Sequence, residues 1–111
     1  MLVLNRFVVP PDTQDGFVSE AHAALAALAE RPGYVSGRLT RALDDPAHWT
    51  LVTEWESVGA YRRALGGFDV KVRATPLLAR SVDGPSAFET LASAAPGGTV
   101  TVTASDRSVD V

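Results

Sequence analysis

The sequence predicts one α+β domain in which helices cover one face of an antiparallel sheet. Its 111 residues suit a single domain, and segments with a period of two alternate with segments of helical spacing. Both patterns meet between His48 and Phe68. Side chains alternate as far as Trp55, Ser57 then offers an N-cap hydroxyl, and apolar residues recur at helical spacing after it. We therefore expect a strand that runs directly into a helix. Trp55 at the junction is either a core residue or the wall of a pocket.

The first strand is expected from Leu2 to Val9 and is apolar on both faces. A strand of this kind is usually covered on both sides. Asn5 shares a face with Val3 and Phe7. Its amide must therefore be satisfied by the backbone or be directed at a bound molecule. The Pro-Pro pair that follows ends the strand, because proline cannot donate to a ladder.

The first helix is expected next, with Asp12 or Thr13 as its N-cap and an end at the Arg-Pro-Gly sequence before Tyr34. Its apolar residues form one stripe that would face the sheet, namely Phe17, Ala21, Ala24, Leu25 and Leu28. His22 lies beside this stripe. It reads either as a half-exposed helix histidine or as a ligand contact.

A second strand from Tyr34 to Leu43 is joined by an Asp-Asp-Pro turn to the third, which starts at His48. Gly37 would permit a bulge or a close approach. After the Ser57 helix, a second short helix from Val70 to about Arg80 is expected. Asp69 would cap this helix, and Pro76 would bend or shorten it.

Phe88 to Ser93 predicts the fourth strand, so the domain is expected over residues 1–95. The tail, residues 96–111, begins with alternating Thr and Val. It predicts a fifth, edge-type strand as far as Ala104, paired within the chain or with a partner subunit, unless the tail is simply a mobile end.

The order β-α-β-β-α-β is the split βαβ or ferredoxin-like arrangement, with a four-stranded antiparallel sheet. Its uncovered face would expose an apolar patch of Leu2, Leu4, Val8 and Val52. Two such sheets packed face to face would remove this patch from water. We therefore expect a two-fold homodimer that buries on the order of 1,600 Å².

Composition excludes several classes of function. Ten basic against thirteen acidic residues give a net charge of −3, which is no electrostatic footprint for nucleic acid. The absence of cysteine excludes disulfides and thiolate chemistry and fits the cytoplasm. The apolar start MLVLNRFVV reads as a strand and not as a signal peptide, and no run has the length of a membrane span. His22 and His48 lie on different elements, so no metal site is expected.

Four segments, in this order and spacing, resemble the antibiotic-biosynthesis monooxygenase family of dimeric α+β barrels. They are VLNRFVVPP around Asn5, PGYVSGRL after the first helix, EWESVGAY with Trp55 and Tyr61, and FET at 88–90. The resemblance runs from Leu2 to about Ser93. It implies a dimeric α/β barrel with a pocket between sheet and helices in each subunit.

The resemblance also implies an activity, namely oxidation of a flat aromatic polyketide or quinone precursor by dioxygen without metal, flavin or haem. By this resemblance, Asn5 would hydrogen-bond an oxyanion or peroxo group, Trp55 would stack on the substrate, and Tyr61 would donate or relay a proton. The expected substrate contacts are Phe7, His22, Trp49 and Phe68.

Two alternative functions remain, and the role of one group of basic residues is open. A non-catalytic small-molecule-binding or stress-related dimer would have the same fold. A haem-degrading branch of the resemblance needs a histidine on the helix after Trp55. No residue from Ala60 to Ala79 is a good neutral ligand for haem iron, which disfavours this branch. Finally, five basic residues form either a solvated helix face or an entrance that attracts an anionic substrate, namely Arg62, Arg63, Lys71, Arg73 and Arg80.

Overall fold

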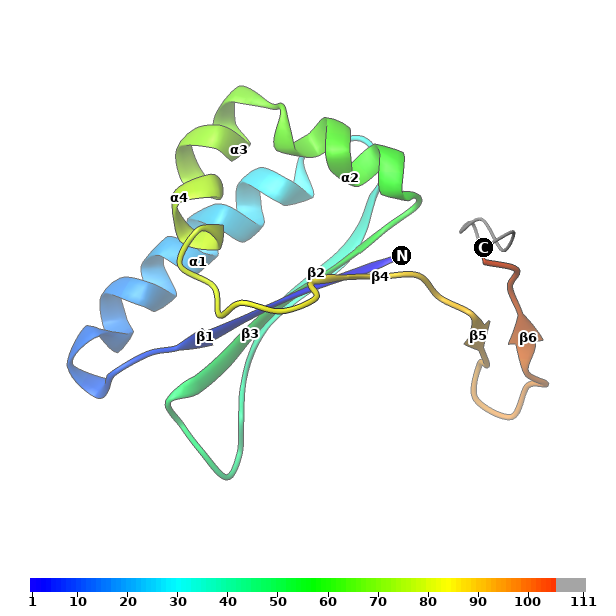
Figure 1. Cartoon of the computed structure of the whole chain (residues 1–111), viewed down its shortest axis with the longest axis horizontal. Helices are drawn as coiled ribbons and strands as arrows, with labels where there is room; N and C mark the ends of the chain where they lie inside the picture. The colour runs from blue at the N-terminus through cyan, green and yellow to red at the C-terminus, as the bar shows by residue number, and fades with distance from the viewer. Residues whose placement is uncertain (106–111) are drawn as a thin grey trace.

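The computed structural model describes residues 1–105, and its helices all lie on one side of a twisted sheet (Figure 1). The elements are β1 (Leu2–Val8), the 3₁₀ turn η1 (Pro11–Thr13), α1 (Gln14–Ala29), β2 (Tyr34–Arg41), β3 (His48–Trp55), α2 (Val58–Leu65), α3 (Phe68–Arg73), α4 (Thr75–Leu78), β4 (Ala87–Phe88), β5 (Ala92–Ser93) and β6 (Thr101–Val102). The main sheet is antiparallel with the order β2-β3-β1-β4. This is the ferredoxin-like topology, so the predicted fold class is confirmed.

The register of the three long strands sorts their side chains onto two faces. Asn5 lies opposite Leu51, and Phe7 lies opposite Trp49, on the face that the helices cover. Because side chains alternate along a strand, Trp55 shares this covered face. The alternation predicted for the third strand is therefore observed, and every residue of interest on β1 and β3 points toward the helices.

The core lies between this face and the helices. Helix α1 contributes the predicted stripe with one change, since Leu25 is only partly buried while Ala27 is buried. From the second helical region, Ala60, Ala64, Val70, Ala74 and Leu77 are also buried. The alanines allow close approach of helix and sheet. The larger apolar side chains each contribute roughly 1.5–3 kcal/mol by leaving water.

The N-caps predicted for α1 and α2 have different outcomes. The Ser57 hydroxyl accepts a hydrogen bond from the Ala60 amide at 3.0 Å, as expected for the N-cap of α2. Before α1, however, the Thr13 hydroxyl donates to the Pro10 carbonyl and caps nothing. The prolines that end β1 start a 3₁₀ turn, and this turn leads into α1 through backbone bonds alone.

The second helical region is divided more finely than the sequence suggests. Asp69 is not a cap, because α3 starts one residue earlier and has Gly67 at its N-cap position. Pro76 lies in the first turn of α4, a separate four-residue helix, where its missing N–H is no loss. Ala74 has αR geometry and joins the two short helices.

The fourth strand is much shorter than predicted. Only Ala87 and Phe88 pair with β1, and before them the backbone bonds Val82 N–Arg6 O (2.7 Å) and Leu4 N–Ser86 O (2.6 Å) hold the segment beside β1. Ala92 and Ser93 leave the sheet and pair with β6 instead. The predicted fifth strand is therefore two residues long and internal to the chain, while residues 106–111 of the predicted tail lie outside the described residues.

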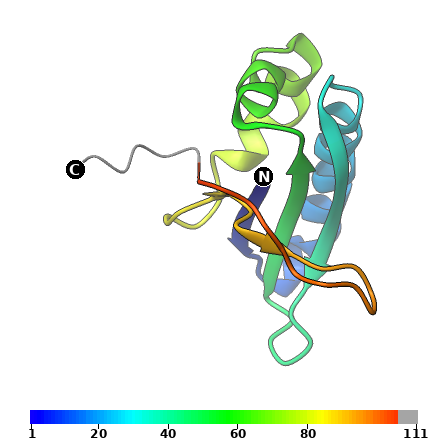
Figure 2. The same cartoon turned by 90° about the vertical axis from the view of Figure 1, so that its right-hand side faces the viewer.

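The β5–β6 hairpin stands away from the main body in Figure 1, and in Figure 2 it lies in front of the sheet, toward the viewer. Its apolar side chains are exposed, among them Leu91, Val100 and Val102. A turn at Gly97, whose φ is +70°, closes the hairpin. The hairpin therefore adds nothing to the core of the main sheet.

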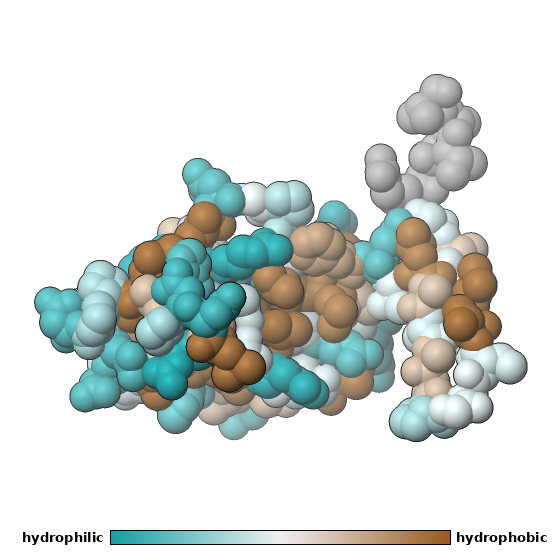
Figure 3. All heavy atoms as spheres, turned by 90° about the horizontal axis from the view of Figure 1, so that it is seen from below, coloured by the Kyte–Doolittle hydropathy of each residue, from teal (hydrophilic) through white to brown (hydrophobic). Residues whose placement is uncertain are grey.

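The uncovered face of the main sheet carries the apolar patch expected from the sequence. Leu2 and Val8 are exposed, Leu4 and Val52 are partly buried, and apolar surface shows among polar side chains when this side is viewed (Figure 3). A single chain leaves this face open and does not close a barrel.

Candidate functional site

Two aromatic clusters occupy opposite ends of the covered sheet face. Trp49 belongs to one and Trp55 to the other, and the two residues are six positions apart on β3, which corresponds to about 20 Å. The residues predicted to form one site therefore fall at two places. Asn5 lies between the clusters, opposite Leu51.

The cluster at the β3–α2 junction consists of Trp55, Tyr61 and Tyr34. The Trp55 ring lies 5.4 Å from the Tyr61 ring at 56° and 5.4 Å from the Tyr34 ring at 87°. Both are favourable aromatic geometries. The indole is 1% exposed, and its N–H donates to the Thr53 hydroxyl at 2.8 Å. Trp55 is thus a fixed part of the core, with Tyr61 between it and the outside.

Two close approaches hold this cluster against the sheet. A Cβ on Gly37 would lie 2.5 Å from the Tyr34 hydroxyl and 2.8 Å from Leu25, so the glycine makes room for the tyrosine. Gly33 has φ +88°, and a Cβ there would lie 2.4 Å from the Ala60 Cβ. The turn before β2 is therefore in close contact with α2, the helix that carries Tyr61.

Tyr61 lines a pocket of about 670 Å³ between α2 and the α3–α4 segment. The other lining residues are Leu65, Lys71, Thr75, Leu78 and Ala79, so the walls are mainly apolar. A pocket of this size accommodates a small molecule of several rings. We call it the Tyr61 pocket and regard it as the candidate active site.

The electrostatics of the Tyr61 pocket favour an anionic ligand. Burial raises the pKa of the Tyr61 phenol above its usual 10.0, so the hydroxyl stays protonated at neutral pH and can donate a hydrogen bond. Lys71 brings a positive charge, and no carboxylate is among the lining residues. Residues 58–79 hold four basic side chains and one acidic one, in a chain whose net charge is −3, while Arg80 is paired with Glu20 away from this pocket. This surface therefore attracts anions.

Asn5 is a buried polar residue of β1, whereas the fully buried side-chain atoms without a partner in residues 1–105 are Nε of Arg31 and Nε1 of Trp49. The residue is 9% exposed, and within residues 1–105 its amide makes no hydrogen bond. It is also absent from the lining of the Tyr61 pocket. Because the amide atoms of Asn5 are not among the fully enclosed ones, water or a small molecule can reach them, and Asn5 is a candidate for a role other than packing.

The other predicted substrate contacts lie away from the Tyr61 pocket. Phe7 and Trp49 are buried in the second cluster, where Phe17 stands 5.1 Å from the Phe7 ring and 5.5 Å from the Trp49 ring. His22 is exposed on α1, and Phe68 is 80% exposed at the start of α3. Neither is among the lining residues of the Tyr61 pocket.

Sequence reasoning did not single out most of the pocket lining. Leu65 and Leu78 follow the helical spacing of core residues, and only the gap between the helices turns them outward to a pocket. Lys71 was visible as one of five basic residues in this region. The signal that could have identified it was the charge asymmetry of residues 58–80.

Neither a cluster that could hold a metal ion nor a membrane-spanning helix occurs within residues 1–105. No three His, Cys, Asp or Glu side chains come together in a way that could hold a metal ion. Among the helices described, the longest has 16 residues, and none is long and apolar enough to cross a membrane.

Comparisons with known proteins place this geometry in context. Residues 1–71 match the family model for antibiotic biosynthesis monooxygenases. Two curated Streptomyces proteins are similar: the 42.8 kDa protein in the whiE locus of S. coelicolor, 35% identical over 60 residues, and protein SchA of S. halstedii, 34% identical over 56 residues. These alignments cover 50% and 47% of this chain. The chain spans about 15% of the length of each relative.

Solved structures share the fold. SnoaB, a cofactor-independent oxygenase from Streptomyces nogalater, has a TM-score of 0.63 and 23% identity, covering 99% of this chain and 96% of its own. A conserved protein from Methanosarcina mazei has a TM-score of 0.64 and 19% identity, covering 78% of this chain and 84% of its own. At these identities the likeness concerns the arrangement of helices and strands.

Proposed function

The chain belongs to the antibiotic biosynthesis monooxygenase family, and on this premise we propose that it oxidises a flat aromatic substrate with dioxygen, without metal, flavin or haem. The substrate would be a polyketide or quinone-precursor-like molecule. The observation that carries the proposal is the Tyr61 pocket, in which a protonated phenol and an ammonium group face apolar walls.

The proposed reaction balances with dioxygen as the only oxidant. In a substrate such as an anthrone, a ring CH₂ becomes a carbonyl. One oxygen atom enters the product, and the other leaves as water with the two hydrogens. The step begins with loss of a proton to water or buffer, because the resulting anion holds the electrons that dioxygen accepts. Each protein group then acts on this anion or on the reduced oxygen.

Lys71 would hold the substrate anion at the exposed rim of the pocket, where its ammonium group attracts negative charge. Tyr61 would donate its proton to the reduced oxygen. Trp55 would act from behind Tyr61 by fixing the phenol ring. For Asn5 we keep the proposal of a hydrogen bond to an oxyanion or peroxo group, supported by its unpartnered amide. This role requires the helices to open a path between Asn5 and the pocket.

A second function is favoured by a different observation. Trp55 is enclosed by two tyrosines and is 1% exposed, as in a core residue that never meets a ligand. In that case the Tyr61 pocket would bind a small aromatic molecule without chemistry. Binding without oxygen consumption is the result that separates this function from the first.

Oxygen uptake with an anthrone or a dihydroxynaphthalene tests the proposal. We expect oxygen uptake above the uncatalysed rate. Tyr61→Phe should lower the rate of uptake about 10²-fold, and Lys71→Gln should raise the KM for the aromatic substrate. Arg73→Gln is the matched control, because Arg73 lies on α3 outside the pocket lining. Uptake equal to the uncatalysed rate, with aromatic binding retained, would leave only the binding function.

We further propose that the chain works as a homodimer that forms a dimeric α/β barrel. The support is the open sheet face with its apolar patch, together with the projecting hairpin and its exposed Leu91, Val100 and Val102. Two copies packed on this face would remove both apolar surfaces from water.

A further inference from the structure

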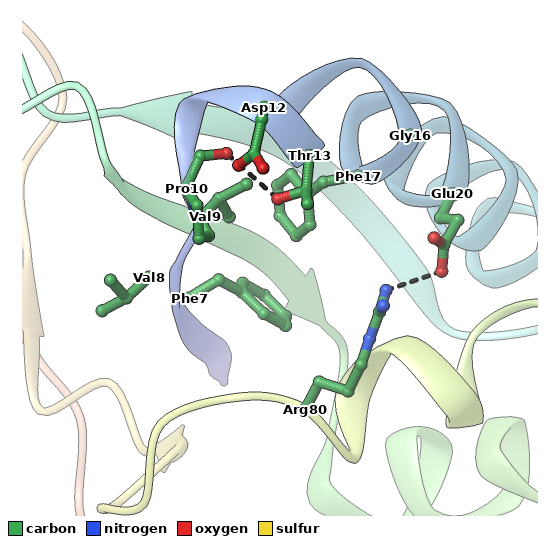
Figure 4. A pocket seen from close by; sticks show the side chains of 10 residues that line it. All are labelled: Phe7, Val8, Val9, Pro10, Asp12, Thr13, Gly16, Phe17, Glu20 and Arg80. Carbon is green, nitrogen blue, oxygen red and sulfur yellow. Dashed lines mark hydrogen bonds and ion pairs between the residues drawn. The ribbon is translucent and has the colours of Figure 1, made fainter.

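A second pocket lies at the other end of the sheet and shares no lining residue with the Tyr61 pocket. It has a volume of about 530 Å³ and is formed by the end of β1, the start of α1 and Arg80 (Figure 4). We call it the Phe7 pocket. Apart from Phe7, which the sequence suggested as a substrate contact, none of the residues assigned to the proposed oxidation lines it.

The floor of the Phe7 pocket is apolar and rigid. The Phe7 and Phe17 rings lie 5.1 Å apart at 56°, and Trp49 supports Phe17 from behind at 5.5 Å. Figure 4 shows the Phe7 ring directed into the space between β1 and Arg80, with Val8 pointing away from it. Such a floor suits an aromatic or branched apolar group, because both rings are already held by the core.

An ion pair crosses the rim of this pocket. Nη2 of Arg80 lies 2.6 Å from Oε2 of Glu20, and both side chains are about half exposed. Figure 4 shows Arg80 reaching from the segment after α4 to α1. Within residues 1–105, Glu20 is the one hydrogen-bond partner of this guanidinium, and the bond uses only its Nη2 atom. An exposed pair contributes little to stability, so a ligand can replace it at small loss.

Gly16, an exposed residue in the first turn of α1, leaves open space at the rim of the pocket. It lines the pocket, and a Cβ at this position would meet no atom within 4 Å. Glycine inside a helix destabilises it relative to alanine, and no packing neighbour requires it here. The missing side chain leaves the rim clear between Thr13 and Glu20.

We propose that the Phe7 pocket binds a zwitterionic small molecule with an aromatic body, such as an amino acid with an aromatic side chain. The opposite charges of Arg80 and Glu20 at the rim favour a ligand that carries both charges. A monoanion would take Arg80 and leave Glu20 unpaired, and a monocation would do the reverse. A zwitterion pairs its carboxylate with Arg80 and its ammonium with Glu20, so every charge keeps a partner. Asp12, the remaining charged residue of the lining, adds attraction for the ammonium.

Three matched probes test the proposal on the whole chain. They are L-phenylalanine, 3-phenylpropionate, which lacks the ammonium group, and phenethylamine, which lacks the carboxylate. Calorimetric titration should give binding of phenylalanine that is about 2- to 5-fold tighter than that of either analogue, the gain expected for one half-exposed ion pair. Equal or tighter binding of either analogue would overturn the zwitterion assignment, and no binding of any probe would overturn the site.

Variants of the pocket residues show where phenylalanine binds, without any measurement of oxidation. Gly16→Leu should abolish phenylalanine binding by filling the pocket, while Gly16→Ala should retain the fold and weaken binding less. Arg80→Gln should remove the tighter binding of phenylalanine relative to phenethylamine. Glu20→Gln should remove its tighter binding relative to 3-phenylpropionate. Arg73→Gln serves as the control with unchanged binding. Binding that survives Gly16→Leu in a folded protein would place the ligand elsewhere. Binding that Gly16→Leu abolishes is assigned to the Phe7 pocket, and any binding of 3-phenylpropionate that remains in this variant is assigned to the Tyr61 pocket.

Discussion

The indole N–H of Trp55 donates to the hydroxyl of Thr53, two residues earlier on the same face of β3, at 2.8 Å and out of contact with water. Residues i and i+2 of a strand lie side by side, so the bond fixes the ring plane along the strand. It also satisfies the only polar atom of a side chain that the core encloses. The position of Tyr61, and with it the shape of its pocket, depends on this ring.

Thr53→Val should reveal the value of this bond. Valine has nearly the same shape, but it leaves the indole N–H buried without an acceptor, so we expect the free energy of unfolding to fall by about 1–3 kcal/mol. Thr53→Ser keeps the hydroxyl and serves as the control. Urea denaturation measures both, and equal stabilities for valine and serine would mean that water satisfies the indole.

Asn5→Leu separates a functional amide from a structural one. Because the Asn5 amide has no partner within residues 1–105, its removal should leave the free energy of unfolding unchanged or raise it by about 1 kcal/mol. Oxygen uptake should fall at the same time. A loss of stability by more than about 2 kcal/mol would instead assign the amide to the fold.

Gly33→Ala should destabilise the protein through two effects. Alanine is strained at φ +88°, and its Cβ would collide with the Ala60 Cβ, so a loss of about 2–5 kcal/mol is expected. Gly84→Ala tests the strain alone, because φ there is +145° and no atom lies within 4 Å. Denaturation curves of the two variants should therefore differ by the cost of the collision, and similar curves would contradict it.

Stability in alkaline solution should depend on Tyr61. Burial raises its folded-state pKa above the ordinary 10.0, so the unfolded chain releases the phenolic proton first. The contribution of Tyr61 is therefore constant below pH 10 and falls as the pH rises from 10 through the folded-state pKa. In the Tyr61→Phe variant, the free energy of unfolding should therefore decline less steeply as the pH rises above 10. Burial also raises the pKa of Tyr34, so Tyr34→Phe is the comparison that shows how the decline is shared.

Charge on the open sheet face should dissociate the proposed homodimer. Val8→Glu places a carboxylate in the apolar patch, and light scattering at micromolar concentration should then give the mass of one chain. Val72→Glu is the control, because Val72 is similarly exposed but lies on α3, on the other side of the sheet. A wild-type protein that is itself monomeric would contradict the assembly.

The long elements were predictable because each depends on a pattern repeated along the segment. The alternation from Trp49 to Trp55 and the stripe of α1 specify their faces by themselves, and Ser57 marks its helix by a local hydrogen bond. The short elements depend on neighbours. Phe88 to Ser93 looks like one strand, but β1 offers pairing only as far as Phe88, and the rest pairs with β6.

The candidate site was predictable only in part, for a related reason. Residue types suggested Asn5, Trp55 and Tyr61, and the structure brings Trp55 and Tyr61 into contact. Whether a side chain faces a void depends on how two helices fit together, and no spacing in the sequence encodes that gap. Lys71 and Leu65 therefore emerge only from the packing of α2 against the segment that follows it.

The placement of one tryptophan in each aromatic cluster gives the protein two built-in optical reporters. Trp49 stands behind the Phe7 pocket, and Trp55 stands behind the Tyr61 pocket. With the other indole replaced by phenylalanine, the emission of each single-tryptophan chain would register events at one end of the sheet alone. Occupancy of the two ends, and any communication between them, can then be followed by fluorescence without an attached dye.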